Sequence, residues 1–200
     1  MSISVILMII NFVSIILIIS YLSGKTLGYE MIINDEFSTY VKDKKILNEY
    51  YFEKLHNTSS ESRKFVKSDS INFNLKLIDK DEYLETNEAI EFLDKNINLY
   101  VEGYNLILDG KKIANIDGKE VFDNVKERLI KYYLKEHNLE NSQINWTKIK
   151  EDVKLEKDVI NLKSLLSEDE LYDFIISNNK NNNTIATVEI VARKTYLENN

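Results

Sequence analysis

The 200-residue chain is acidic, with a net charge of −7 and a sequence pI of about 5.1, and it contains no cysteine. The lack of cysteine excludes disulfides, a thiolate nucleophile and Cys-type zinc sites. The acidic balance, with lysines interspersed among acids, argues against nucleic acid as a partner. This length allows one domain or two small ones.

The N-terminal segment is the most apolar part of the chain. No charged residue occurs from Ile3 to Leu22. A helix of this length spans the ~30 Å hydrocarbon core of a bilayer, so we predict a transmembrane anchor over residues 1–24. A cleaved signal peptide is the first alternative, but no Lys or Arg precedes Lys25 to form its basic region. A buried helix of a soluble protein is the second.

The rest of the chain contains two similar stretches. The stretch beginning at Tyr29 matches the stretch beginning at Tyr104 at an offset of 75, and residues 73–93 match residues 155–175 at an offset of 82. We therefore predict an internal repeat. The predicted divisions are α+β repeat 1 over residues 25–103, α+β repeat 2 over residues 104–195, and a C-terminal tail over residues 196–200.

Each copy is predicted to contain a strand hairpin, a helix, an extended strand, a short helix and a final strand. In the first copy Asn34-Asp35 occupies the hairpin turn, because both residues tolerate positive φ. An apolar stripe over residues 46–55 predicts the first helix, and a polar loop follows over residues 57–70. The extended strand is expected at 71–78 and the final strand at 99–104.

In the second copy, Asp109-Gly110 is a favoured pair for a two-residue hairpin turn. Asp117 is expected to cap a helix whose apolar stripe runs over residues 121–133. An extended segment at 153–162 and a capping box at Ser167–Glu170 follow. A polar loop is expected at 178–183 and a last strand at 185–191. The predicted fold class is α+β: an N-terminal transmembrane helix followed by two tandem copies of this unit.

Catalytic motifs are lacking. The sequence contains no His-Glu-x-x-His, no phosphate-binding loop and no Gly-x-Ser-x-Gly. His56 and His137 each fall near the end of a predicted helix, where a histidine complements the helix dipole. The paired acids lie in lysine-rich segments that are typical of a solvated surface. We therefore predict a protein that is not an enzyme and that has no catalytic, cofactor-binding or metal-binding residue.

Aromatic residues are the best candidates for an interaction surface. The pairs Tyr50-Tyr51 and Tyr132-Tyr133 place adjacent rings on each first helix, so one ring of each pair faces the core and the other lies nearer solvent. Exposed rings can stack on sugars or on a partner protein. We select Tyr51, Tyr132 and Trp146 as this surface; core packing with solvated phenols is the alternative.

Two segments carry a resemblance to a known family. Residues 106–113 (LILDGKKI) and 165–171 (LLSEDEL), behind an N-terminal span, resemble the N-terminal repeat region of clostridial (Firmicutes) membrane-anchored cell-wall endopeptidases of the lysostaphin-type metallopeptidase family. The closing segment 187–191 is similar to the one that leads into the next module of those proteins. The His-x-x-x-Asp and His-x-His zinc ligands of their catalytic domain are absent here, so the resemblance implies a location near peptidoglycan and not hydrolysis.

These observations predict a membrane-anchored, extracytoplasmic, non-catalytic module. It would act as a spacer or docking domain in peptidoglycan-associated or sporulation processes, with an envelope protein or peptidoglycan as partner. The charges near the anchor do not fix its orientation, since Lys25 is soon followed by acids. Two alternatives stay open: a truncated N-terminal part of a cell-wall peptidoglycan endopeptidase, and a cytoplasm-facing anchored regulator.

Overall fold

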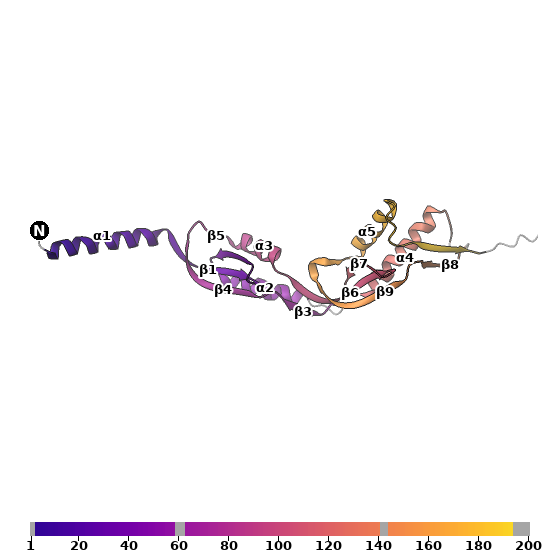
Figure 1. The fold of residues 1–200 in the computed structure, drawn as a ribbon, viewed down its shortest axis with the longest axis horizontal. Helices are drawn as coiled ribbons and strands as arrows, with labels where there is room; N and C mark the ends of the chain where they lie inside the picture. Colours follow the sequence, from indigo (N-terminus) through magenta and orange to yellow (C-terminus); the bar gives the residue numbers. More distant parts are fainter. Residues whose placement is uncertain (1–2, 59–62, 141–143, 194–200) are drawn as a thin grey trace, which may run out of the picture. The chain divides into compact units, whose positions relative to one another are not determined.

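The computed structural model describes residues 3–58, 63–140 and 144–193 of a mixed α+β protein. An N-terminal helix precedes a strand-rich region, which confirms the predicted fold class at this level (Figure 1). The chain forms two compact units. The first contains Met1–Asn57 and Ser68–Asn98, and the second contains Thr58–Lys67 and Leu99–Asn200. The predicted tail over 196–200 lies outside the described residues.

Helix α1 (Ile3–Ser23) has 21 residues, none of which is buried. Its serines return hydrogen bonds to the helix itself. The hydroxyl of Ser14 donates to the backbone carbonyl oxygen of Ile10 at 2.8 Å. The hydroxyl of Ser23 donates to the backbone carbonyl oxygen of Ser20 at 2.7 Å. These hydroxyls therefore need no water, and an apolar environment tolerates them.

The first unit contains one four-stranded sheet in the order β4-β1-β2-β5. The hairpin turn between β1 and β2 has positive φ at Asn34 (52°) and Asp35 (59°), as a type I′ turn requires. Strand β4 pairs antiparallel with β1, and β5 pairs parallel with β2. The elements of this unit are β1 (Lys25–Ile33), β2 (Phe37–Val41), α2 (Lys44–Thr58), β4 (Ile71–Asp79), β5 (Tyr83–Leu84) and α3 (Thr86–Asn96).

The second unit contains a five-stranded sheet and a separate two-stranded ribbon. In the sheet, β10, β7 and β6 lie in that order, and both β9 and β3 pair with β6. The ribbon is formed by β8 and β11, which are antiparallel. The elements are β3 (Phe65–Ser68), β6 (Leu99–Leu108), β7 (Lys111–Ile116), α4 (Lys119–Glu136), β8 (Ile144–Ile149), β9 (Val153–Asn161), the 3-10 turn η2 (Leu162–Ser164), β10 (Leu165–Leu166), α5 (Glu168–Lys180) and β11 (Val188–Ala192).

The two sheets share an order of strands. The order β4-β1-β2-β5 of the first unit corresponds to β9-β6-β7-β10 of the second. Tyr29 pairs with Val41 in the first hairpin. At the offset of 75, Tyr104 pairs with Ile116 in the second hairpin. These registers agree with the alignment that suggested a repeat; a duplication as the origin of the two stretches stays a prediction.

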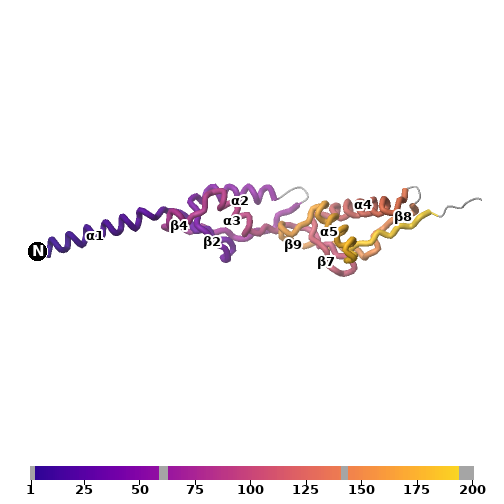
Figure 2. The backbone as a smooth tube through the Cα atoms, turned by 90° about the horizontal axis from the view of Figure 1, so that it is seen from above, coloured from indigo at the N-terminus to yellow at the C-terminus, as the bar shows by residue number. Residues whose placement is uncertain are grey.

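Each unit has its own apolar core. In the first, Met31, Ile33, Leu47 and Leu93 are at most 1 % exposed. In the second, α4 and α5 lie beside one another and pack on the sheet (Figure 2). The apolar stripe of α4 faces this core, as predicted from its helical spacing. Among the described residues, the side chains of this second core with no exposed area are Leu106, Ile116, Val125, Leu129, Leu171, Ile175 and Ala186.

Gly28, in β1, allows a close approach that a side chain would prevent. A Cβ atom at this position would lie 2.4 Å from Cδ1 of Ile78 and 2.9 Å from the carbonyl oxygen of Val41. The isoleucine can rotate, but the backbone oxygen belongs to the neighbouring strand and cannot move aside without breaking the sheet. The position therefore requires glycine, for reasons of space.

We expect Gly28→Ala to lower the free energy of unfolding by about 1–3 kcal/mol, the usual cost of forcing extra atoms into a packed site. Thermal unfolding of the detergent-solubilised chain, followed by circular dichroism, measures the loss. The matched control is Gly24→Ala, because the nearest atom to a Cβ at Gly24 is 4.0 Å away. Equal melting temperatures for the two variants would contradict the steric argument.

Of the two helix caps predicted in the second unit, one is confirmed and one is wrong. Ser167 caps α5 as predicted, since its hydroxyl accepts from the backbone N–H of Glu170. The prediction that Asp117 caps α4 is wrong: Gly118 is the N-cap residue and makes no side-chain cap hydrogen bond. The carboxylate of Asp117 instead accepts hydrogen bonds from Arg63: Nε donates to both of its oxygens at 3.0 Å, and Nη2 donates to Oδ2 at 2.7 Å. This two-pronged ion pair fixes the orientation of the carboxylate.

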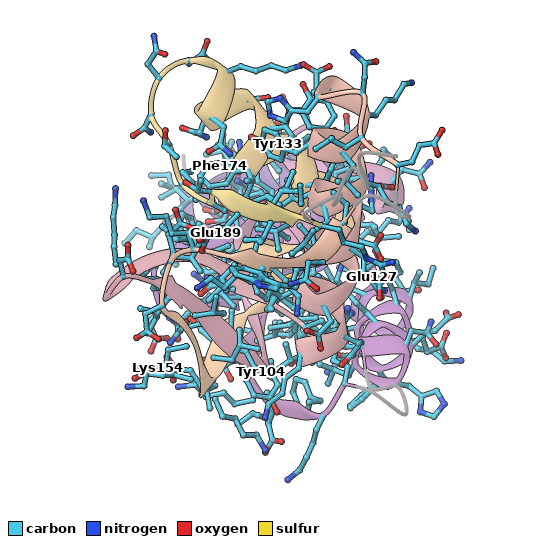
Figure 3. All side chains as sticks on the ribbon, turned by 90° about the vertical axis from the view of Figure 1, so that its right-hand side faces the viewer. Tyr104, Glu127, Tyr133, Lys154, Phe174 and Glu189 are labelled. Carbon is cyan, nitrogen blue, oxygen red and sulfur yellow. The ribbon has the colours of Figure 1, made fainter. Side chains whose placement is uncertain are left out.

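The polar run at 178–183 is not wholly a loop, because α5 continues to Lys180. Asn179 explains the extension. Its side-chain amide donates to the hydroxyl of Tyr133 at 2.9 Å and to the carbonyl oxygen of Ala186 at 2.7 Å, and its oxygen accepts from the N–H of Ile185. Tyr133 therefore lies between α4 and α5 (Figure 3). The strand expected at 185–191 forms over Val188–Ala192.

Candidate membrane anchor and interaction surfaces

Helix α1 is long enough and apolar enough to cross a membrane. Its large apolar side chains are 41–78 % exposed, so it is not a core helix of this structure. Surface of this kind is unfavourable in water, and a bilayer removes the penalty. Its length and composition are those of a membrane anchor or of a signal sequence.

The junction between α1 and β1 is held by hydrogen bonds and charge. The backbone N–H of Lys80 donates to the carbonyl oxygen of Gly24 at 3.0 Å, and Nζ of Lys80 donates to that of Ser23 at 2.6 Å. Lys25 forms an ion pair with Asp79 at 2.6 Å, and this hydrogen bond raises the pKa of Lys25. Two cations thus lie at the C-terminal end of α1, where they complement the helix dipole.

Tyr51, in α2, is less available than the sequence suggested. Its ring is half-buried, and its hydroxyl forms a hydrogen bond with the hydroxyl of Ser68. The neighbouring Phe52 is 66 % exposed. The most exposed aromatic side chain of this helix is therefore Phe52, which the sequence analysis did not select.

Tyr132 and Trp146 belong to the second unit, on α4 and β8. Tyr132 is half-buried against the core, with its ring edge-on to Tyr133 at 5.1 Å between centroids. Trp146 is 40 % exposed, and Nζ of Lys148 lies 5.3 Å from its ring centroid. Of the three selected residues, Trp146 offers the most open ring. Tyr51 lies in the other unit, so the three do not belong to one compact unit.

Tyr50 links α2 to α3 instead of reaching solvent. Its hydroxyl donates to Asp94 at 2.7 Å, and Lys54 forms an ion pair with the same carboxylate at 2.6 Å. Because the hydrogen bond stabilises the neutral phenol beside a carboxylate, it raises the pKa of Tyr50 to about 12. This contribution to stability is fully present below pH ~10 and is lost as the pH rises through about 12.

We expect Asp94→Asn to lower the pKa of Tyr50 towards the ordinary tyrosine value, because the amide carries no charge. Alkaline titration of phenolate absorbance measures this change. Subtracting the titration of Tyr50→Phe from that of the parent protein isolates the Tyr50 signal, once in the native background and once in the Asp94→Asn background. An unchanged difference curve would show that Asp94 does not set this pKa.

The histidines lie at helix ends, as predicted. His56 is in the last turn of α2, and His137 is the C-cap residue of α4; both are exposed. Within residues 3–58, 63–140 and 144–193, no group of three or more His, Asp or Glu side chains is placed to hold a metal ion. At these positions a protonated histidine complements the helix dipole.

Two hollows are large enough for a small ligand or a peptide segment. The first, of about 530 Å³, lies in the first unit between β1, α2 and α3 and is lined by Leu27, Val41, Ile46, Leu84 and Ala89 among others. The second, of about 480 Å³, lies between α4, β8 and β9 and carries Lys119, Lys126, Lys148 and Asp123 around an apolar floor. Apolar walls with a few charged groups are typical of binding sites.

The molecule is thus an α+β protein with one N-terminal helix able to span a membrane. Comparison with known proteins adds no family to this description: no protein-family model, no curated protein and no solved structure matches the chain.

Proposed function

We propose that the protein is a membrane-anchored, extracytoplasmic, non-catalytic module that acts as a spacer or docking domain in the cell envelope. The observation that carries the proposal is α1, an apolar helix without a single buried residue, attached directly to a charged α+β region. A helix of this kind fixes the rest of the chain to the membrane surface, where it can present strands, grooves and rings to a partner.

The junction after α1 supports an anchor that is retained. β1 begins at Lys25, directly after Gly24, and the carbonyl oxygens of Ser23 and Gly24 both accept hydrogen bonds from Lys80. A signal peptidase needs an accessible extended segment with small residues at its cleavage site. Here the backbone at the end of the helix is already occupied by contacts with the first unit.

An outer location near peptidoglycan is supported by the resemblance to clostridial wall endopeptidases, carried by residues 106–113 and 165–171. Exposed aromatic side chains suit a glycan or protein partner, because sugars stack on rings and ring edges pack on apolar surface. Phe52 in the first unit and Trp146 in the second are two such exposed rings. The partner is therefore proposed to be peptidoglycan or an envelope protein.

Protease treatment of intact protoplasts tests the proposed orientation. An epitope fused after Asn200 is expected to disappear from intact protoplasts, while a cytoplasmic marker protein survives until the cells are lysed. Survival of the epitope in intact cells, with digestion after lysis, would contradict the proposal and favour a cytoplasm-facing regulator. Cosedimentation with purified peptidoglycan then separates a glycan partner from a protein partner.

A further inference from the structure

Four large apolar side chains are exposed at one end of the first unit. Leu27 is 65 % exposed, Leu75 63 %, Leu77 44 % and Ile46 42 %. Leu27 and Leu77 are paired in register on β1 and β4, so their side chains lie on the same face of the sheet, and Leu75 follows two residues from Leu77 on that face. Ile46 and Leu27 line the same hollow. We call these four residues the leucine patch.

The fold does not require this position to be apolar. The second unit has Glu102 where the first has Leu27, Lys157 where the first has Leu75, and Val159 where the first has Leu77, by strand order and register. Glu102 forms ion pairs with Lys157 at 2.7 Å and with Lys64 at 3.3 Å. The hydrogen bond from Lys157 lowers the pKa of Glu102. Two of these three positions are thus charged in the second unit and apolar in the first.

The unit with the apolar version is the unit that carries α1. Leu27 lies four residues beyond Ser23, the last residue of α1. An extended chain advances ~3.3 Å per residue, so Leu27 lies within roughly 14 Å of the end of the helix. The headgroup zone on each side of the hydrocarbon core is about 5–7 Å thick. A side chain on β1 can therefore reach the boundary between headgroups and acyl chains.

The residues around the junction are those expected at the membrane–water interface. Tyr21 lies in the last turn of α1, and Nζ of Lys25 lies 5.4 Å from the centroid of the Tyr21 ring. Tyrosine rings and lysine ammonium groups both favour the headgroup level, the first because it is amphipathic and the second because its stem can extend to water.

We propose that the leucine patch rests on the lipid surface that α1 enters, so that the first unit lies on the membrane instead of hanging free from it. The inference depends on the proposed function, since it assumes that α1 is inserted in a bilayer. Its occupant is the lipid interface, because Leu27 follows the end of α1 by four residues and because Glu102 and Lys157, at the matching positions of the unit without α1, form an ion pair.

A pair of matched fluorescent probes tests the inference in the full chain. In a Trp146→Phe background, Leu77→Trp reports on the leucine patch and Val159→Trp reports on the matching position of the second unit. The two side chains are equally exposed, Leu77 at 44 % and Val159 at 45 %. Each protein is reconstituted into phosphatidylcholine–phosphatidylglycerol vesicles containing lipids with a doxyl quencher near the headgroup. We expect the emission of Leu77→Trp to shift to the blue and to be quenched severalfold more than that of Val159→Trp.

A third variant separates failure of the patch from failure of the anchor. Phe12→Trp places the probe near the middle of α1, where quenching by lipids that carry the doxyl group near the end of the acyl chain is expected if α1 is inserted. Quenching at Phe12→Trp with equal, weak quenching at Leu77→Trp and Val159→Trp would overturn the patch while leaving the anchor intact. A lack of quenching at Phe12→Trp would overturn the anchor itself. A blue shift at Leu77→Trp that depends on protein concentration and comes without lipid quenching would overturn the lipid contact. It would show instead that a second copy of the chain covers the leucine patch.

Discussion

Replacing Val13 and Leu17 of α1 with arginine is expected to release the protein from the membrane. Both residues lie near the middle of the helix, and their spacing of four places the two charges on one face. Each arginine at the centre of a span costs about 2.5–3.5 kcal/mol on insertion scales. The double variant therefore loses roughly 5–7 kcal/mol of insertion free energy, enough to lower partitioning into the bilayer by more than a thousandfold. Carbonate extraction of isolated membranes, followed by immunoblotting of pellet and supernatant, measures the release.

The control replaces the same two residues with alanine, which removes apolar area without adding charge. This variant is expected to stay in the membrane pellet, because the remaining run from Ile3 to Leu22 is still uncharged. Retention of the arginine variant in the pellet would contradict an inserted α1. Recovery of the native protein in the supernatant, with a mass lacking the first residues, would identify α1 as a cleaved signal sequence.

The second large effect is expected in the core of the second unit. Leu129, in α4, is fully buried in the cluster that also contains Leu106 and Ile175. Leu129→Ala removes apolar contacts and leaves a cavity between α4, α5 and the sheet. Truncations of this kind cost about 2–5 kcal/mol of unfolding free energy. Thermal and urea unfolding of the detergent-solubilised chain, followed by circular dichroism, measures the loss.

The same substitution at an exposed leucine gives the baseline. Leu75 is 63 % exposed, so Leu75→Ala is expected to change stability by no more than about 0.5 kcal/mol. A loss at Leu75→Ala as large as the loss at Leu129→Ala would mean that burial in this structure does not report the packing in solution.

Features with a local signal could be predicted from the sequence. The turn at Asp109-Gly110 was predicted from a pair of residues that favour positive φ, and the structure has φ of 48° and 77° there. A helix was predicted from apolar residues at helical spacing over 121–133; α4 forms over Lys119–Glu136, and Val125 and Leu129 are both buried. In each case the information lies within a few residues of the element that it specifies.

Features that depend on residues far apart in the sequence could not be predicted from the sequence. Arg63 lies 54 residues before Asp117 in the sequence. The residues around Asp117 therefore gave no sign that its carboxylate would bind an arginine instead of capping α4. Strand β3 occupies a segment that was expected to be a polar loop, and its ordering comes from pairing with β6. Likewise β8 follows a polar segment and pairs with β11. Their composition alone does not distinguish such edge strands from loops.

The candidate surface shows the same limit. The sequence identified the adjacent pair Tyr50-Tyr51 on a predicted helix, but not which aromatic ring of that helix is exposed to solvent. That depends on Ser68, which binds the hydroxyl of Tyr51 from beyond the end of the helix. The selected Tyr51 is therefore half-buried and Phe52 is open. The leucine patch could be recognised only once the register placed Leu27 opposite Leu77.

The pairing of β3 with β6 has a consequence for synthesis of the chain. β3 ends at Ser68, whereas β6 begins only at Leu99, so the ribosome completes β3 well before its partner exists. At 5–20 residues per second, the interval is on the order of a few seconds. The strands of the first sheet, β1, β2, β4 and β5, also precede β6 in the chain. Strand β3 is therefore synthesised, together with the whole of the first sheet, before the strand with which it pairs.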